Sequence, residues 1–171
     1  VAWSIIYEMA GLRAKKLLPI FKASKGKMGR LSIQTNAKYY RNTRKMVEQA
    51  VTMNSLGENM QVKIPASAAG IRAMEEATYR GVSINATVSF TVAQAVAVAE
   101  AVERGLKRRE AEGLPTDTMA PICTIMIGRT DDWLKKYVND EGILVNPECL
   151  EWAGIAVIKE AYRIYKERGY R

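Results

Sequence analysis

Long stretches with helical periodicity alternate along this chain with short runs of β-branched and other apolar residues. The helical pattern predicts helices over Trp3–Ala23, Lys38–Thr52, Ala68–Tyr79, Val92–Glu112, Asp131–Val138 and Pro147–Arg168. The short apolar runs predict strands over Arg30–Thr35, Met60–Ala66, Val82–Val88 and Ile122–Ile127. Four successive strand–helix units after one leading helix predict an α/β protein with a parallel sheet and helices outside it.

Three local signals support these boundaries. Thr91, with Gln94 three residues later, has the form of a capping box at the start of a helix. Gly81 stands where a glycine is expected just past a helix C-terminus. The stretch Gly113–Pro115 breaks the long fourth helix.

Within the predicted strands, polar residues alternate with apolar ones. Because successive strand residues point to opposite faces, the apolar positions should face the helices and the polar positions the other side of the sheet. The apolar set comprises Leu31, Ile33, Val62, Ile64, Ile84, Ala86, Cys123 and Ile125, and the polar set gathers Gln34, Lys63, Asn85, Thr87 and Thr124, with Met126 on the same side as Thr124. A sheet covered on both sides normally reads as continuous apolar runs. Burial of this polar face costs free energy unless its groups are paired, so the pattern predicts a binding or catalytic site.

Lys63 is the unusual member of this set, because Val62, Ile64 and Pro65 surround it. One interpretation is an edge residue whose aliphatic stem covers apolar surface. The other is a buried lysine, since removing an ammonium group from water favours the neutral amine that adds to carbonyls. Lys63 lies on the same strand face as the other polar residues, which favours the second interpretation. A buried, neutral lysine among polar residues indicates an aldol-type Schiff-base site.

A Schiff base between Lys63 and a ketone would act as an electron sink for carbon–carbon cleavage. The chain has no histidine, so protons would move through a water held by amide or hydroxyl groups. Gln34 and Thr87 suit that task, and Asn85 suits the orientation of a substrate hydroxyl or carbonyl. Gln34 cannot itself be the base, because its amide carries only hydrogen-bond donors and a carbonyl acceptor.

Composition narrows the function classes further. The chain has 171 residues, 48% hydrophobic and 26% charged, as in ordinary soluble globular proteins. No apolar run approaches the ~20 residues of a membrane span, and no secretory signal pattern is seen, so no membrane partner is expected. Two cysteines, Cys123 and Cys149, are too few for a disulfide framework and lack metal-ligand spacing. These features predict reduced thiols, a cytoplasmic location and no metal site, and the missing histidine excludes Ser–His and Cys–His nucleophile pairs.

The formal net charge of +8 allows three interpretations. The basic residues are spread over amphipathic helices with acidic neighbours nearby, which is typical of solvated helix faces. A preference for anionic small substrates is the second interpretation, and a nucleic-acid-binding module is the third. No stretch that combines basic and aromatic residues stands out, so no nucleic-acid partner is expected.

Three segments resemble the transaldolase family and occur in the order and spacing expected there. Val62–Ser67 is similar to its Schiff-base lysine segment, and Gly81–Ala95 to its next strand and helix. Ile127–Trp133 is similar to the end of a later strand and the turn beyond it. The resemblance extends from about Arg30 to Arg168.

The resemblance implies a TIM-type (β/α)8 barrel and a pentose phosphate pathway transferase that needs no dissociable cofactor. Lys63 would form a Schiff base with a ketose phosphate such as fructose 6-phosphate or sedoheptulose 7-phosphate, and a dihydroxyacetone unit would pass to an aldose phosphate. Asn85 and Thr124 would contact substrate, Thr87 would hold the catalytic water, and Arg129 would bind the substrate phosphate. For Arg129, an ion pair with Asp131 or Asp132 is the alternative.

Two positions depart from the family pattern. Gln34 stands where transaldolases usually carry a glutamate, and in this it resembles the small fructose-phosphate aldolases, which cleave without transfer. Met126 stands where both groups tend to carry an aromatic residue, and a methionine fills space without relaying a proton. Aldol cleavage without transfer, and a structural relative whose site has lost activity, therefore remain alternatives to transaldolase activity.

Length sets a further expectation. A barrel of this type typically needs about 250 residues, whereas this chain supplies about four βα units, or half a barrel, as one partial barrel domain over residues 1–171. The chain also opens without a methionine and inside a predicted helix, which indicates part of a longer barrel. Open sheet edges invite pairing with another chain, so we expect homo-oligomers formed through these edges.

Overall fold

A computed structural model describes residues 2–170 and confirms the predicted succession of elements. The strands are β1 (Leu31–Gln34), β2 (Met60–Pro65), β3 (Ile84–Ser89) and β4 (Ile122–Ile125). The α-helices are α1 (Ala2–Ala23), α2 (Thr43–Asn54), α3 (Ala68–Tyr79), α4 (Val92–Ala111), α5 (Ile127–Asp140) and α6 (Ala153–Arg168), with short 3-10 helices η1 (Ala37–Tyr39) and η2 (Pro147–Glu151).

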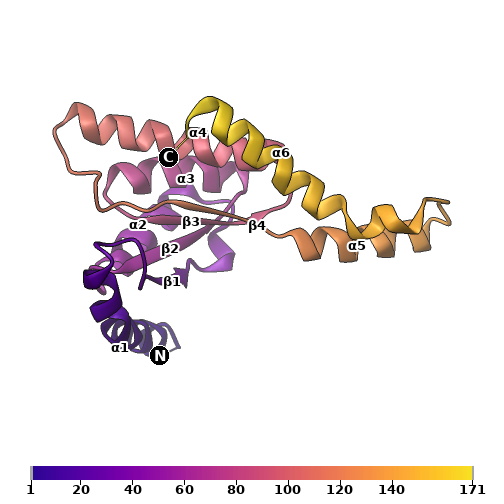
Figure 1. Cartoon of the computed structure of the whole chain (residues 1–171). Coiled ribbons are helices and arrows are strands. Elements are labelled where there is room, and N and C mark those ends of the chain that lie inside the picture. Colours follow the sequence, from indigo (N-terminus) through magenta and orange to yellow (C-terminus); the bar gives the residue numbers. More distant parts are fainter. Residues whose placement is uncertain (1, 171) are drawn as a thin grey trace.

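The four strands form one parallel sheet in the order β1-β2-β3-β4. Helices α2, α3 and α4 lie along one face of this sheet, and α1 lies beside the β1 edge (Figure 1). The hairpin of α5 and the first part of α6 extends away from the sheet beyond β4 (Figure 1). Within residues 2–170, β1 and β4 each have one edge without a partner strand. The α/β class and the four parallel strands of a partial barrel agree with the sequence prediction.

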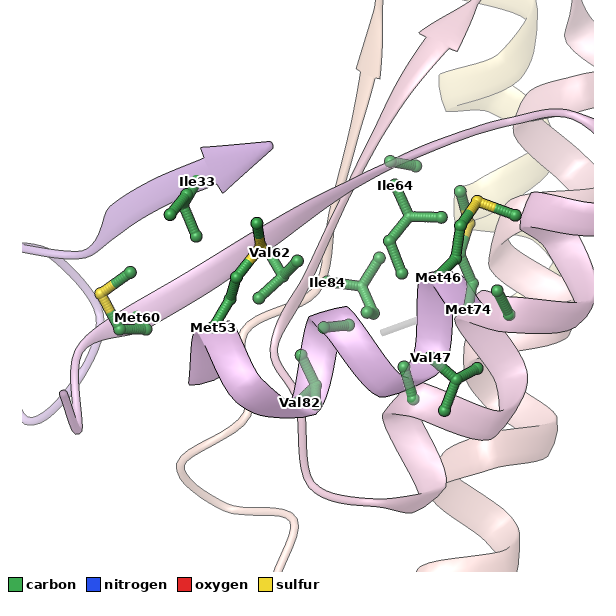
Figure 2. Close-up of a cluster of buried hydrophobic side chains, with 14 of the residues drawn as sticks. Ile33, Met46, Val47, Met53, Met60, Val62, Ile64, Met74, Val82 and Ile84 are labelled. Carbon is green, nitrogen blue, oxygen red and sulfur yellow. The ribbon is translucent and has the colours of Figure 1, made fainter. Parts of the chain in front are cut away.

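The core lies mainly between the sheet and the helices α2 and α3, and residues of α1 and α4 complete it. Apolar side chains of the strands meet methionine, valine and alanine side chains of the two helices (Figure 2). The buried members labelled in that view are Ile33, Met46, Val47, Met53, Met60, Val62, Ile64, Met74, Val82 and Ile84. The apolar strand positions therefore face the helices, as their alternation predicts.

Local sequence signals position several of these elements. The Thr91 side chain accepts a hydrogen bond from the Gln94 backbone N–H, and the Gln94 side chain accepts one from the Thr91 N–H, so the predicted capping box is confirmed. Gly81 ends α3 with a φ of 87°, a left-handed conformation that favours glycine. Gly70 is required by a close approach, because a Cβ there would lie 1.8 Å from the Pro65 carbonyl oxygen. These contacts hold α3 tightly against the end of β2.

The prediction of one helix over Lys38–Thr52 is wrong at its start. The structure has the 3-10 helix η1 followed by a separate helix α2 that begins at Thr43. The reason is competition from two asparagine caps: the Asn36 side chain accepts from the Lys38 N–H, and the Asn42 side chain accepts from the Lys45 N–H. The chain therefore restarts its helix at Asn42.

Two further boundaries differ from prediction. Helix α5 begins at Ile127 rather than near Asp131, so it directly follows the last strand. The predicted final helix over Pro147–Arg168 divides at Trp152 into η2 and α6. The remaining ends agree to within one or two residues, which is the usual spread for fraying termini.

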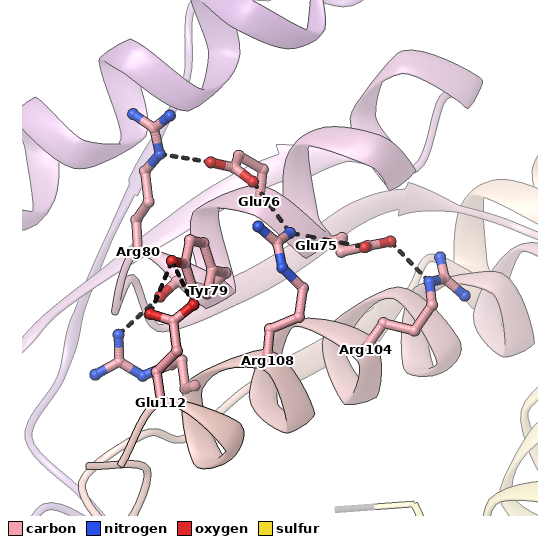
Figure 3. A network of polar contacts seen from close by, with 8 residues as sticks. Glu75, Glu76, Tyr79, Arg80, Arg104, Arg108 and Glu112 are labelled. Atoms are coloured by element: carbon pink, nitrogen blue, oxygen red, sulfur yellow. Dashed lines mark hydrogen bonds and ion pairs between the residues drawn. The ribbon is translucent and has the colours of Figure 1, made fainter. Parts of the chain in front are cut away.

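Most charged side chains lie on the outer faces of the helices. Between α3 and α4, Arg104 and Arg108 form ion pairs with Glu75 and Glu76 (Figure 3). Arg109 is different, because it is buried and donates to the Tyr79 and Pro115 carbonyl oxygens. Charged residues therefore lie on solvated helix faces, as expected. The exception is Arg109, whose side chain is buried and holds the turn that follows α4. None of the described helices is both long and apolar enough to cross a membrane.

Candidate functional site

The centre of the polar face is a row of three residues on adjacent strands. In the sheet register, Gln34 of β1 pairs with Lys63 of β2, and Lys63 pairs with Asn85 of β3. Adjacent strands lie ≈ 4.8 Å apart, and paired residues point to the same face. The structure therefore brings Gln34, Lys63 and Asn85 together on the face opposite the helices.

Burial on this face is uneven. Gln61 and Thr87 are buried, Lys63, Asn85 and Thr124 are partly buried, and Gln34 is exposed. Lys63, which the sequence predicts to be buried in a partly desolvated site, is therefore only partly buried within the described chain. The physical reason is that the described sheet does not close into a barrel, so none of its own helices covers this face.

Hydrogen bonds join Asn85 to its neighbours across the sheet. Thr124 Oγ1 donates to Asn85 Oδ1 at 2.9 Å, and Asn85 Nδ2 donates to Ser32 Oγ at 3.2 Å. Ser32 Oγ donates in turn to Gln61 Oε1 at 2.9 Å. Ser32 and Gln61 are polar-face residues that did not enter the predicted site, although the same alternation places both beside it.

Gln34 and Lys63 are held mainly through the backbone. The Lys63 carbonyl oxygen accepts from Gln34 Nε2 at 3.4 Å and from Thr35 Oγ1 at 3.1 Å. The ion pairs of the described residues lie on helices and adjoining loops, and none includes Lys63. The ammonium group of Lys63 is therefore not neutralised by a carboxylate of residues 2–170.

The carboxyl end of β3 is irregular immediately beyond Thr87. Val88 has a φ of 54°, an unusual left-handed conformation for a β-branched residue, and the pairing of β3 with β4 shifts between Ala86 and Ser89. Gln94 Nε2 holds this end by donating to the Val88 carbonyl oxygen at 3.2 Å and to the Ala66 carbonyl oxygen at 3.1 Å. Such local strain tends to accumulate at functional sites.

A cleft of about 520 Å³ opens at the carboxyl ends of the strands. Its lining residues are Gln34, Ala37, Tyr40, Pro65, Ala66, Ser67, Val88 and Gln94. In parallel α/β sheets and barrels, ligands bind at the carboxyl ends of the strands. The cleft therefore adjoins the row of polar side chains at the expected end of the sheet.

The last predicted site residues lie at the junction of β4 and α5. Met126 caps the start of α5 instead of continuing the strand, and it makes no side-chain capping hydrogen bond. Arg129 is exposed in the first turn of α5 rather than in a turn beyond the strand, because the helix begins earlier than predicted. The alternative ion pair of Arg129 with Asp131 or Asp132 is not formed in the described chain, and Asp131 Oδ1 instead accepts from the Gly154 N–H at 2.8 Å.

The two cysteines lie outside this row. Both are free thiols; Cys123 faces the helix side of β4 and Cys149 is exposed. Burial raises the pKa of the Cys123 thiol, and burial likewise raises the pKa of the neighbouring Tyr165 phenol. Among the described residues, no cluster of carboxylate and cysteine side chains could hold a metal ion.

Comparison with known proteins gives one consistent result. Residues 3–171 match the family described as Transaldolase/Fructose-6-phosphate aldolase. The chain is 31% identical to a transaldolase of Thiobacillus denitrificans over 153 residues and 30% identical to transaldolase 2 of Streptomyces avermitilis over 152 residues. It is also 28% identical to a transaldolase of Mycobacterium tuberculosis. Each match covers 88% of this chain but only 41% to 43% of the relative, so the chain spans less than half the length of these proteins.

Proposed function

Since the chain belongs to the transaldolase/fructose-6-phosphate aldolase family, we propose that it carries a lysine Schiff-base site for sugar phosphates. Lys63 is the proposed nucleophile, a ketose phosphate such as fructose 6-phosphate is the proposed donor, and no dissociable cofactor is required. Transfer of a dihydroxyacetone unit to an aldose phosphate would place the reaction in cytoplasmic carbohydrate metabolism, within the pentose phosphate pathway. The row formed by Gln34, Lys63 and Asn85 is the observation that carries this proposal.

The proposed reaction has balanced steps. The neutral Lys63 amine adds to the ketone carbon, and loss of water gives a protonated imine. Removal of the proton from the C4 hydroxyl group breaks the C3–C4 bond, releases an aldehyde, and sends the bonding electron pair to the imine as an enamine. The enamine then attacks the aldehyde carbon of an aldose phosphate, and the proton taken from the C4 hydroxyl group returns to the new alkoxide oxygen. Water finally hydrolyses the new imine and frees Lys63.

The neighbouring side chains suit these steps. Thr124 and Asn85 already share a hydrogen bond and offer further polar atoms to substrate hydroxyl groups. The Thr87 hydroxyl makes no hydrogen bond within residues 2–170, so it can hold the water that moves the C4 proton, together with Gln34.

For the phosphate we propose Arg129. It occupies the first turn of α5, where the backbone N–H groups have no side-chain cap. An anion is stabilised at such a helix start by the unpaired N–H groups and the helix dipole, and a guanidinium group adds two parallel donors. Met126, at the same junction, would fill space against the substrate.

Borohydride trapping tests the nucleophile directly. The protein is incubated with fructose 6-phosphate and borohydride, and the reduced adduct is located by peptide mass spectrometry. We expect the adduct on Lys63 and its loss in Lys63→Met, while Lys107→Met, which removes an exposed lysine of α4, retains it. Absence of an adduct in the folded native protein would refute the proposed function, and so would an adduct on Lys107 alone.

Aldol cleavage without transfer is the second candidate, because Gln34 supplies no carboxylate. If an adduct forms, addition of erythrose 4-phosphate distinguishes the two: a seven-carbon ketose phosphate indicates transfer, whereas its absence with continued aldehyde release indicates cleavage. Gln34→Glu restores a proton acceptor, so we expect it to increase turnover by roughly 10²-fold, the lower range for a general base. An inactive structural role is supported instead if no adduct forms.

We also propose that the chain self-associates through the open edges of β1 and β4. Unpaired strand edges present free N–H and C=O groups to another chain. Large apolar side chains also remain exposed, including Ile5 and Leu12 on α1 beside the β1 edge and Trp133 and Trp152 on the hairpin that extends beyond β4. Light scattering tests this proposal; a monodisperse monomer at micromolar concentration contradicts it.

A further inference from the structure

A chain of hydrogen bonds crosses the polar face from β4 to β1 and back to the segment before β4. Its successive donors are Thr124, Asn85, Ser32 and Gln61, and its final acceptor is the Ala120 carbonyl oxygen. From this chain we infer that Ser32 and Gln61 are positioning residues, which set the direction in which Asn85 and Thr124 present hydrogen-bond donors and acceptors to a substrate. The inference rests on the proposed function for its role in the reaction.

The direction of the hydrogen bonds in this series follows from the last one, between Gln61 and the Ala120 carbonyl oxygen. Gln61 Nε2 lies 2.7 Å from the Ala120 carbonyl oxygen, and a carbonyl oxygen can only accept. The Gln61 amide nitrogen must therefore face Ala120, which turns its Oε1 towards Ser32. Gln61 is 2% exposed, so water does not readily compete for these bonds.

The directions of the next two bonds follow from this orientation of Gln61. Gln61 Oε1 is an acceptor, so the single hydroxyl proton of Ser32 must point to it across 2.9 Å. Ser32 can then only accept from Asn85, which requires the Asn85 amide nitrogen on that side, at 3.2 Å. Asn85 Oδ1 consequently faces Thr124, whose hydroxyl must donate to it at 2.9 Å.

This arrangement defines what the site can offer a ligand. Asn85 retains one N–H hydrogen as a donor, and the Thr124 oxygen, its proton already committed, retains only acceptor capacity. A substrate oxygen beside Asn85 should therefore accept, and a hydroxyl group beside Thr124 should donate. Lys63 pairs with Asn85 in the sheet register, so these preferences apply to the hydroxyl groups of a ketose held on Lys63.

Removal of Ser32 or Gln61 should therefore affect polyol substrates more than a simple ketone. We would measure rates of borohydride-trapped adduct formation with fructose 6-phosphate and with hydroxyacetone, which lacks the C3 and C4 hydroxyl groups. Ser32→Ala and Gln61→Met should each lower the ratio of the two rates by about tenfold, the order of one hydrogen bond, with the hydroxyacetone rate changed by less than about twofold. Ser32→Thr keeps the hydroxyl group and should restore the ratio.

A matched control is available on the same face. Ser83→Ala removes a buried serine hydroxyl that accepts from Arg30 but lies outside the chain of bonds. It should leave the ratio unchanged. Equal loss of both rates in Ser32→Ala, or the same ratio change in Ser83→Ala, would overturn the inference, because a merely structural defect affects both ketones alike.

A second measurement does not depend on chemistry at Lys63. The side-chain amide of Asn85 gives a ¹⁵N–¹H signal pair, which should shift in Ser32→Ala and also in Gln61→Met, although no described hydrogen bond joins Gln61 to Asn85. An Asn85 signal unchanged by Gln61→Met would refute the transmitted orientation. If native protein forms no adduct with either ketone, the proposed function fails, and these amide signals still decide whether the chain of bonds orients Asn85.

Discussion

Replacing Lys63 and replacing its neighbour Ile64 in β2 should have opposite effects: one should remove the reaction with ketones, and the other should lower the stability of the fold. Lys63 faces the polar side of the sheet, whereas Ile64 faces the helices and has 0% exposure in the core. Lys63→Met should abolish the trapped adduct and leave the fold intact. Ile64→Ala should leave trapping intact in the folded protein but lower its stability substantially.

The magnitudes follow from the surroundings of the two side chains. Ile64 loses its buried methyl and methylene groups and leaves a cavity, which costs about 3 kcal/mol within the usual range of 2–5. For a protein of this size, that corresponds to a fall in Tm of roughly 6–12 °C. Lys63 is partly exposed and lies outside every ion pair of the described chain, so Lys63→Met should change the unfolding free energy by less than about 0.5 kcal/mol.

Two assays are needed for this comparison. Urea unfolding followed by circular dichroism gives the free energies, and borohydride trapping with fructose 6-phosphate at 25 °C gives the chemistry. Lys107→Met controls for loss of a lysine. A loss of more than about 1.5 kcal/mol in Lys63→Met would refute the reasoning, because it would give Lys63 a structural role. So would loss of trapping in Ile64→Ala at a temperature where that variant remains folded.

Three further predictions test separate parts of the molecule. Arg129→Gln should weaken binding of fructose 6-phosphate by about 10- to 100-fold in the trapping assay, because a charge-assisted contact to the phosphate is lost. Binding of hydroxyacetone, which has no phosphate, should not change. Equal weakening for both ketones would count against phosphate binding by Arg129. Burial raises the pKa of the Cys123 thiol, so the neutral thiol is favoured in the folded state. The stability of the protein should therefore fall as the pH rises above about 8.5, the pKa of the thiol in the unfolded chain. Urea unfolding midpoints at pH 7 and pH 9.5 should differ less in Cys123→Ala than in the native protein, and an identical difference would contradict this prediction. Gly105→Ala should lower the free energy of unfolding measured in urea by about 1–3 kcal/mol. The added Cβ would lie 2.6 Å from the Glu75 carbonyl oxygen and 2.7 Å from Thr78 Cβ, where α4 packs on α3. Unchanged stability would show that the two helices can separate without cost.

Part of the candidate site was predictable because strand alternation is a local property. The period of two along each strand assigns Lys63, Asn85 and Thr124 to one face and Val62 and Ile84 to the other, and the structure agrees. The same alternation marks Ser32 and Gln61, yet it does not show which polar residues bond to one another. That choice depends on neighbouring strands and on the Ala120 carbonyl, 59 residues from Gln61.

Helix boundaries were less predictable where side-chain caps compete. Asn36 and Asn42 each stop the helical pattern locally, and the structure selects a 3-10 turn between them. The start of α5 directly after β4 changes the setting of Arg129 from a loop to the first helical turn. Periodicity could not give this result, because the helix start is decided by backbone pairing, including the bond from the Met126 N–H to the Ser89 carbonyl oxygen.

The sequence alone thus determined the succession of strands and helices, the faces of the strands and the singular position of Lys63 among apolar residues. Tertiary structure decided the register that sets Gln34, Lys63 and Asn85 in one row, the strained turn at Val88 and the partial exposure of the polar face. The physical reason is the distance along the sequence over which each property is set. Alternation arises from the geometry of neighbouring peptide units, whereas register and burial depend on how helices distant in sequence pack against the whole sheet.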